Sequence, residues 1–333
     1  MPADDRFSVR EYRDGDEQAI LDLFARCFPH APRTIEHFRW KYRENPFGNA
    51  HISLTFDEQQ RLAGHYSGYV VPFRAYGKDL LAHQIGDTMT DVSVRHDGRG
   101  PTSILGRTAL DFYARFCEGQ IAFNYGFNVA NIQKFSLRFL RSDRVEPVTY
   151  RVRDLRAHPL HRIGPFARRL RGYHLELVKE TTVEWDELFE RVSSAYRFLV
   201  RRDARYVRWR YLEWPDRTYF MIAIRKHRRL VGWIAFRIVE NRFAWGDGLF
   251  DPDHPDALEV MLRHVVPSYP VELIEAWFPP RPKWFDALLG ELHFEVRPEP
   301  QNLSVMCVPF TWPDVVDRMR EDLYYTWGDS DLF

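Results

Sequence analysis

The pattern of apolar and polar positions predicts both helices and strands along the chain. Apolar residues recur at helical spacing between Ile20 and Cys27, which predicts a helix over 15–28. Two apolar runs, 51–56 and 62–71, flank a polar turn and predict a pair of strands. The elements predicted next are a strand over 84–94, a helix from about 102 to 116, a strand over 121–127 and a helix over 131–140. The chain therefore combines paired strands with amphipathic helices.

The opening of this pattern recurs in the second half of the chain. Two heptads, Trp40–Pro46 and Trp209–Pro215, read Trp, basic, Tyr, any, Glu, any, Pro. Each is followed by an apolar run, a charged turn and an Arg-Leu-x-Gly tetrapeptide, which starts at Arg61 and at Arg229. Self-similarity at this distance predicts an internal duplication, and the period is too long for a solenoid. We therefore expect two domains of one type.

Composition excludes several classes of function. The 333 residues contain 47 Lys and Arg against 47 Asp and Glu, so no net charge attracts nucleic acid or a membrane surface. The three cysteines are too scattered for a disulfide framework, and the histidines show no metal-binding spacing. No signal-like apolar start and no run of membrane-spanning length is present. The sequence predicts a cytoplasmic protein with no metal, no membrane span and no nucleic-acid partner.

An arginine-rich segment, residues 151–172, separates the two copies of the pattern. Residues 152–172 contain six arginines and a single Asp. One interpretation is a solvated linker helix whose arginines cover the seam between the copies. The other is a docking patch for a phosphate-rich partner such as coenzyme phosphates, a carrier protein or a membrane surface. The expected domains are residues 1–150 and 173–333, joined by this linker.

The strongest chemical signal is a strand, a turn and a helix start over residues 91–103. A helix N-terminus points several backbone N–H groups at one spot, and its dipole favours an anion there. Gly100 in the turn lets the backbone approach a phosphate closely, and Arg99 adds positive charge. The stretch therefore predicts an anion site.

This stretch resembles the acetyl-CoA pyrophosphate loop of the GNAT superfamily of N-acetyltransferases. The residues that match the family pattern in register are Asp91, Val94, Arg99, Gly100 and, in the next helix motif, Asn128. The string over 84–128 looks like the Eis-like branch, in which two GNAT folds stand in tandem, although this chain is too short for the usual sterol-carrier-like domain. The resemblance implies an α/β (α+β) fold of two GNAT-like domains, each a mixed, mostly antiparallel twisted sheet flanked by helices.

The resemblance also implies an activity and a coenzyme site in the first copy. The activity is transfer of an acyl group, from acetyl-CoA or another acyl-CoA, to an amine of a small molecule or amino sugar. The splayed strand would hold the acyl carbonyl. The coenzyme contacts implied are Val92, Ser93, Val94, Arg99, Gly100, Thr102, Ser103 and Asn128.

Three features depart from the family pattern. Thr102 and Ile104 stand where the loop has Gly or Ala, and Pro101 removes one backbone donor. Phe135 stands where a Tyr often protonates the departing thiolate, so no phenol can act at that position. The second copy has an acid-rich turn, residues 247–258, in place of the loop, and its carboxylates would repel a pyrophosphate. The coenzyme is therefore expected in the first copy alone.

Catalysis needs a proton acceptor for the amine and a proton donor for the thiolate. Asp87 and Asp91 are candidate bases, because in an unbulged strand they share one face with His83. The alternative for each is a structural Asp hydrogen-bonded at a strand end. Tyr125, on the next strand, is the candidate acid in place of Phe135. The carboxylates of the second copy would suit a cationic acceptor if they faced the thioester, and otherwise are solvated.

Two other functions stay open. The chain could be a GNAT-derived binding protein in which Thr102 and Phe135 record lost chemistry. It could also be an aminoacyl-tRNA-dependent transferase, since such enzymes use tandem GNAT folds. The balanced charge argues against the second alternative, because affinity for tRNA depends on contacts with phosphates.

Overall fold

The chain forms two compact units in the computed structural model, which describes residues 6–31, 33–49, 51–164 and 171–333. Unit 1 comprises Met1–Pro72, Leu80–Pro147 and Leu303–Arg320. Unit 2 comprises Phe73–Asp79, Val148–Asn302 and Glu321–Phe333. Each unit is therefore assembled from segments that are far apart in the sequence.

Unit 1 is built around a mixed sheet in the order β1-β2-β3-β4-β5-β15-β6. Its strands are β1 (Phe7–Glu11), β2 (His51–Asp57), β3 (Leu62–Ala75), β4 (Lys78–Thr90), β5 (Phe123–Asn128), β15 (Ser304–Pro309) and β6 (Asp143–Pro147). β1, β2 and β3 pair antiparallel, as β15 does with β5 and β6, whereas β4 and β5 are parallel. The β4–β5 pairing covers His83 with Asn124 and Gln84 with Tyr125. Beyond these residues the two strands separate.

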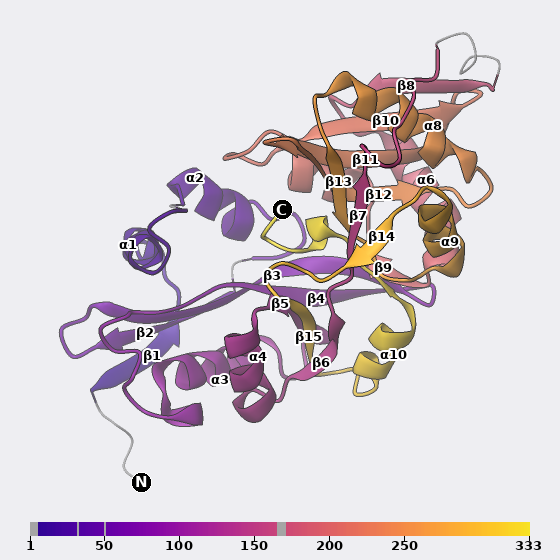
Figure 1. Ribbon diagram of the computed structural model, residues 1–333. Coiled ribbons are helices and arrows are strands. Elements are labelled where there is room, and N and C mark those ends of the chain that lie inside the picture. Colours follow the sequence, from indigo (N-terminus) through magenta and orange to yellow (C-terminus); the bar gives the residue numbers. More distant parts are fainter. Residues whose placement is uncertain (1–5, 32, 50, 165–170) are drawn as a thin grey trace. The chain divides into compact units, whose positions relative to one another are not determined.

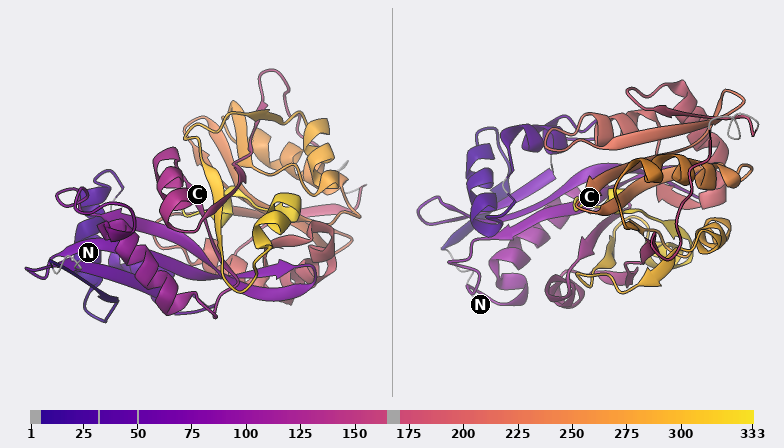
Figure 2. Two further views of the ribbon diagram at one scale, coloured as in Figure 1. Left: turned by 90° about the horizontal axis from the view of Figure 1, so that it is seen from below. Right: turned by 45° about the horizontal axis from the view of Figure 1, so that its top comes forward.

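Helices cover both faces of the unit 1 sheet (Figures 1 and 2). On one face lie α1 (Glu17–Cys27) and α2 (Ile35–Phe38), which continues as the π-helical turn η1 (Arg39–Arg43). On the other lie α3 (Ile104–Phe116) and α4 (Ala130–Phe139). α1 buries Ile20, Leu23 and Phe24, which confirms the helix that the apolar spacing predicts.

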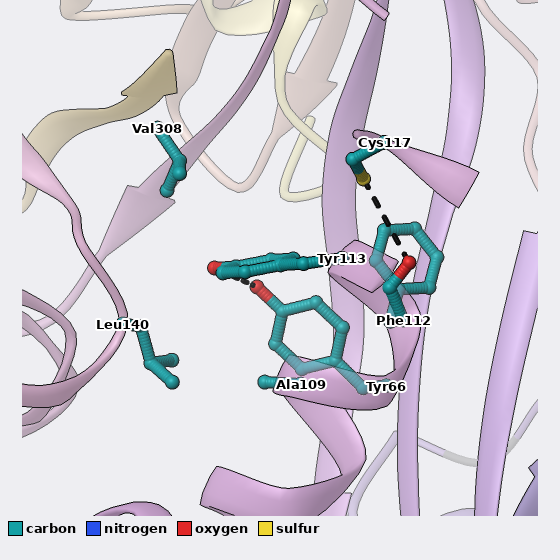
Figure 3. Packing of buried hydrophobic residues seen from close by; sticks show 7 residues of the cluster. All are labelled: Tyr66, Ala109, Phe112, Tyr113, Cys117, Leu140 and Val308. Atoms are coloured by element: carbon teal, nitrogen blue, oxygen red, sulfur yellow. Dashed lines mark hydrogen bonds between the residues drawn. The ribbon is translucent and has the colours of Figure 1, made fainter. Parts of the chain in front are cut away.

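A hydrophobic core fills the α3 side of the sheet (Figure 3). Its cluster consists of Tyr66, Ala109, Phe112, Tyr113, Cys117, Leu140 and Val308. Tyr66 of β3 and Tyr113 of α3 point toward each other, and their hydroxyl oxygens are 3.1 Å apart. Ala109, Phe112 and Cys117 are fully buried. Burial of one large apolar side chain such as Phe112 contributes about 1.5–3 kcal/mol, so this cluster fixes α3 firmly against the strands.

Unit 2 is built around a second mixed sheet in the order β14-β7-β13-β12-β11-β10-β8. Its strands are β14 (Glu295–Arg297), β7 (Tyr150–Asp154), β13 (Leu273–Trp277), β12 (Arg242–Phe250), β11 (Arg229–Val239), β10 (Phe220–Lys226) and β8 (Tyr173–Leu177). β12 and β13 are parallel, and the other pairs are antiparallel. β9 (Phe198–Val200) pairs with β16 (Leu323–Tyr324) and with the last residues of β3.

Unit 2 repeats the helical opening of unit 1. α6 (Val183–Tyr196) is followed by α7 (Ala204–Val207), which continues as the π-helical turn η3 (Arg208–Leu212). The later helices are α8 (Asp256–Val265), α9 (Lys283–Glu291), α10 (Val315–Asp322), which crosses from unit 1 into unit 2, and the short 3-10 turns η4 (Val266–Ser268) and η5 (Trp327–Asp329). Two mixed, mostly antiparallel sheets flanked by helices confirm the predicted fold class. No helix among the described residues is long and apolar enough to cross a membrane.

The limits of the units differ from the expected division at residues 150 and 173. β15, close to the C-terminal end, lies between β5 and β6 in the unit 1 sheet, with Ser304 opposite Asn128. In return, Phe73–Asp79 belongs to unit 2. Local patterns predict that a strand forms, but the choice of sheet depends on partners elsewhere in the chain, so this exchange is invisible in the sequence.

The arginine-rich segment is not a solvated linker helix along its whole length. Residues 150–154 form β7, in which Arg151 and Arg153 are buried. The Arg151 Nε donates to the Phe278 carbonyl at 2.9 Å, and burial lowers the pKa of Arg153. The prediction failed here because it counted charges and overlooked the alternation of a strand. Residues 165–170, which include two of the six arginines, lie outside the described residues.

Candidate functional site

β4 carries a backbone irregularity at the point where it parts from β5. Asp87 has φ of 49°, in the left-handed region that a side chain makes costly. Its carboxylate Oδ2 accepts hydrogen bonds from Lys41 Nζ at 2.7 Å and Tyr42 OH at 2.9 Å. Burial alone would raise the pKa of Asp87, but the positive charges of Lys41 and Arg33 outweigh it and hold that pKa well below its usual range. Asp87 is therefore a firmly ionised anchor for η1.

The irregularity breaks the alternation of side chains along β4. His83 lies on the α3 side, where its Nδ1 is 3.0 Å from Asn124 Oδ1. Asp87 instead bonds to η1, on the opposite side of the sheet. Asp91 follows the last residue of β4, and its Oδ2 accepts from Arg26 Nε at 2.9 Å. The expectation that these three residues share one face is wrong, because it assumed an unbulged strand.

The loop after β4 is shaped by two glycines and leads into α3. Gly98 and Gly100 have φ of 75° and 55°, and a Cβ on Gly100 would lie 2.8 Å from a ring carbon of Phe139. Thr102 Oγ1 accepts from Arg99 N–H at 3.3 Å and donates to Arg99 O at 3.0 Å. Ser103 caps α3 by accepting from Gly106 N–H at 3.1 Å. The loop therefore closes on itself and leaves its glycine-rich side open.

This open side borders a cavity of about 420 Å³. Its lining residues are Thr88, Met89, Thr90, Arg95, Gly98, Arg99, Gly100, Ser103, Leu105, Ile132 and Phe135. The end of β4, the loop and the starts of α3 and α4 thus enclose one space. Two arginines and a helix N-terminus give that space a positive character, which suits a phosphate group.

A second, smaller cavity lies where β4 and β5 separate. It has a volume of about 30 Å³ and takes its walls from Ile85 of β4, Gly126 and Asn128 of β5, and residues of α3, α4 and β15. Tyr66 and Tyr113, whose hydroxyls are hydrogen-bonded to each other, also line this cavity. Burial holds the pKa of both phenols above the ordinary value.

Residues 8–136 match the family model described as an acetyltransferase (GNAT) domain. The match spans the β4 irregularity, the loop, α3 and most of the cavity lining. No curated protein matches the sequence.

Solved structures of similar fold extend over almost the whole chain. A protein of unknown function from Enterococcus faecalis V583, named a probable N-acyltransferase, shares 12% identity and a TM-score of 0.67, with 92% of this chain and 73% of that chain covered. A GCN5-related N-acetyltransferase from Anabaena variabilis shares 12% identity and a TM-score of 0.64 over 91% and 72%. The Saccharomyces cerevisiae N-myristoyltransferase with bound myristoyl-CoA shares 13% identity and a TM-score of 0.59 over 92% and 84%. At these identities the likeness establishes the fold.

The region that matches the acetyltransferase model brings together only part of the predicted coenzyme contacts. Arg99, Gly100 and Ser103 line the large cavity, and Asn128 lines the small one. The hydroxyl of Thr102 is bonded within the loop. Residues 92–94 lie in the turn after β4, outside both sets of lining residues. The strand residues at the cavity are Thr88–Thr90, because β4 ends earlier than its alternating sequence suggests.

Two residues of the loop were missed by the sequence reasoning. In addition, the Ile104 side chain, which replaces a Gly or Ala of the family pattern, does not obstruct the site. Arg95 and Gly98 line the large cavity beside Gly100, and an Arg followed by two glycines at alternate positions was the available signal. Ile104, expected to crowd the coenzyme, is buried and points toward Gly64 of β3. Its Cβ therefore does not narrow the cavity.

Tyr125, the candidate acid, and Phe135, which stands at the usual position of the acid, occupy different environments. Phe135 lines the large cavity and packs against Phe139 with ring centroids 5.2 Å apart. Tyr125 is buried and lines the small cavity, with its ring near those of Phe123 and Phe127. Its role as proton donor stays a prediction. Within the described ranges, no group of three or more metal-binding side chains is present.

The acid-rich turn of unit 2 is only partly solvated, because Asp253 and Asp256 are exposed whereas Asp247 and Asp251 are buried. Asp247 is fully buried and accepts from Arg202 Nε at 2.9 Å and Tyr211 OH at 2.5 Å. Asp251, also buried, accepts from Arg191 Nε at 2.8 Å. Both carboxylates are neutralised by arginines inside unit 2, so neither is available to attract a cationic acceptor.

Proposed function

We propose that the chain is an acyl-CoA-dependent N-acyltransferase that uses acetyl-CoA and acts on an amine of a small molecule or amino sugar. The observation that carries the proposal is the large cavity, which combines Arg95, Arg99 and Gly100 with the N-terminus of α3. Such an arrangement holds a pyrophosphate by backbone N–H groups and positive charge. The match of residues 8–136 to an acetyltransferase domain supports the same ligand.

The small cavity supports a short acyl group. Where β4 and β5 separate, the unpaired backbone of β4 can accept the thioester as an added strand would, which brings the acyl group to this opening. The cavity there has about 30 Å³, room for about two water-sized groups. An acetyl group has this size, whereas a hydrocarbon chain exceeds it.

Calorimetric titration of the full chain with CoA, acetyl-CoA and myristoyl-CoA tests the proposal. We expect micromolar binding of CoA and acetyl-CoA, and turnover of acetyl-CoA with primary amines. Binding without turnover would favour a GNAT-derived binding protein. Absence of binding to all three coenzymes would overturn the proposal and favour the aminoacyl-tRNA-dependent alternative. Faster turnover of myristoyl-CoA than of acetyl-CoA would contradict the assignment of a short acyl group.

A further inference from the structure

His65 of β3 is a buried histidine with a defined tautomer. Only 1% of its surface is exposed. Its Nδ1 lies 2.7 Å from the backbone oxygen of Asp87, and because a carbonyl oxygen only accepts, Nδ1 carries the ring hydrogen. In the neutral ring, Nε2 is therefore the acceptor. Burial lowers the pKa of His65 to about 4, so the ring is neutral at physiological pH.

The acceptor nitrogen of His65 faces a small cavity beneath α1 and α2. Nε2 is fully buried and has no hydrogen-bond partner among the described residues. The cavity has a volume of about 10 Å³ and is also lined by the charged or titratable residues Asp87, Arg33, His37 and Tyr42 and by apolar residues of α1 and α2. This volume is close to that of a single water molecule, and the polar atoms around it supply the partners that a buried water requires. A buried acceptor without a partner is uncommon in folded proteins and calls for an explanation.

The cavity lies next to the proposed coenzyme site. Met89, at the end of β4, lines both the small cavity and the large one. Its side chain is unbranched and flexible, so it separates the two spaces without a rigid wall. The two cavities therefore share Met89 as part of their walls.

The carboxylates nearby are poor proton acceptors in comparison. Asp87 is committed to Lys41 and Tyr42, and the positive charges of Lys41 and Arg33 hold its pKa well below its usual range. Asp91 accepts from Arg26 and from Ser93. Both carboxylates therefore already have strong donors.

The second copy of the pattern has counterparts of these carboxylates but none of His65. Arg-Leu-x-Gly is followed by His65 in the first copy and by Trp233 in the second. Unit 2 has equivalents of both carboxylates, with similar partners, but it lacks the coenzyme loop. The imidazole thus occurs only in the copy that has the loop, whereas the carboxylates occur in both copies.

We propose that His65 Nε2 takes up, through one water molecule in this cavity, the proton that the acceptor amine loses. The inference rests on the proposed function. The amine nitrogen forms a bond to the acyl carbon and the carbon–sulfur bond breaks, so CoA leaves as a thiolate. A proton of the amine passes to the water, and a proton of that water passes to Nε2. The imidazolium that forms lies beside the Asp87 carboxylate, which stabilises its charge, and the proton then returns to the thiolate or to solvent.

The test compares His65→Gln with His51→Gln as a matched control. His51 lies on β2 and its Nδ1 is 2.7 Å from His83 Nε2 on the α3 side of the sheet. CoA affinity is measured by calorimetry. Turnover is measured as CoA release from acetyl-CoA, with glucosamine and with water alone as acceptors. We expect His65→Gln to bind CoA normally and to lose turnover by about 100-fold, while His51→Gln keeps both.

The pH profile distinguishes a proton acceptor from a structural residue. With water as the acceptor, the unchanged chain should give a flat rate between about pH 6 and 8, because a base with a pKa of about 4 is already unprotonated there. In His65→Gln the rate should rise about tenfold per pH unit, since hydroxide must replace the lost base. Added imidazole should restore part of the rate in His65→Ala.

The remaining outcomes distinguish failure of the proposed role of His65 from failure of the proposed function. Equal rates and equal profiles for His65→Gln and the unchanged chain would overturn the role of His65. So would normal CoA binding by the unchanged chain without any catalysed release of CoA from acetyl-CoA. Absence of CoA binding by the unchanged chain would instead overturn the proposed function itself.

Discussion

The two units contain matching Tyr–Asp hydrogen bonds, but only unit 1 has a loop with Arg99 and Gly100 beside a large cavity. In unit 1, Tyr42 of η1 donates to Asp87, and in unit 2, Tyr211 of η3 donates to Asp247. Each repeated heptad thus forms a π-helical turn that brings its Tyr to a carboxylate on the strand opposite. These matched contacts support the internal duplication that the two heptads predict.

A second contact is matched as closely. Arg26 of α1 bonds to Asp91 at 2.9 Å, and Arg191 of α6 bonds to Asp251 at 2.8 Å. In both units the same arginine also donates to a backbone carbonyl of the Arg-Leu-x-Gly stretch. Contacts that occur in both units belong to the architecture, because unit 2 keeps them without an equivalent of the loop that contains Arg99 and Gly100. Asp87 and Asp91 are therefore better understood as structural than as catalytic residues.

The largest effect is expected from removing, in each unit, the buried cation that pairs with the carboxylate bonded to the heptad Tyr. Arg202 bonds to Asp247 and Asp329, and all three side chains are buried. Arg202→Met would strand two buried carboxylates and cost about 3–5 kcal/mol. Lys41→Met strands Asp87 alone, which keeps its bond from Tyr42, and should cost about 2–3 kcal/mol.

Urea denaturation of the full chain measures both variants. A larger loss for Lys41→Met than for Arg202→Met would contradict the view that unit 2 depends more heavily on its internal ion pairs. Retention of CoA binding by folded Lys41→Met would support a structural role for Asp87.

The next effect concerns the loop that unit 2 lacks. Arg99→Glu places a negative charge at the large cavity and should weaken CoA binding by about 100-fold or more, with the fold kept. Arg229→Glu, at an exposed position in unit 2, is the matched control and should leave the affinity unchanged. Calorimetric titration with CoA measures both. Equal weakening by the two substitutions would show that the binding depends on overall charge rather than on the loop.

A smaller effect concerns how the stability contributed by a buried carboxylate in each unit changes with pH. Burial, together with the negative charge of Asp247, raises the pKa of Asp329 to about 6 and outweighs the opposite effect of the Arg202 guanidinium that the two carboxylates share. A carboxyl whose folded pKa is raised contributes stability that is present below its unfolded pKa of about 4 and is lost as pH rises through about 6. Asp87 has a depressed pKa and behaves in the opposite way, so its contribution is lost as pH falls.

Asp329→Asn isolates this contribution. The difference in unfolding free energy between the unchanged chain and the variant should fall by about 1–2 kcal/mol from pH 4 to pH 7. Urea denaturation at several pH values measures it. A difference that grows with pH would show that Asp329 is ionised in the folded chain throughout this range.

The sequence predicted the elements of each unit better than it predicted their geometry. The π-helical turns overlap the first residues of the repeated heptads, and Arg99 and Gly100 lie in a loop that borders the large cavity. The positive φ of Asp87 has no local signal, because an Asp in an alternating run reads as an ordinary strand residue. His65 was equally hidden, since its significance comes from the Asp87 carbonyl on the neighbouring strand. Features that depend on contacts between strands therefore required the structure.

The smallest effect tests where the strand that serves the coenzyme ends. Sequence alternation assigned Val92 to that strand, but Val92 is 51% exposed in the turn after β4, whereas Thr90 lines the large cavity. Val92→Ser should therefore change stability by less than about 0.5 kcal/mol and CoA affinity by less than about twofold. Thr90→Pro would remove a backbone N–H at the cavity and should weaken CoA binding more than Val92→Ser does. If Val92→Ser weakened CoA binding as much as Thr90→Pro, the coenzyme would have to contact the turn after β4. The part of the chain that serves the coenzyme would then extend to Val92, as the sequence alone predicts.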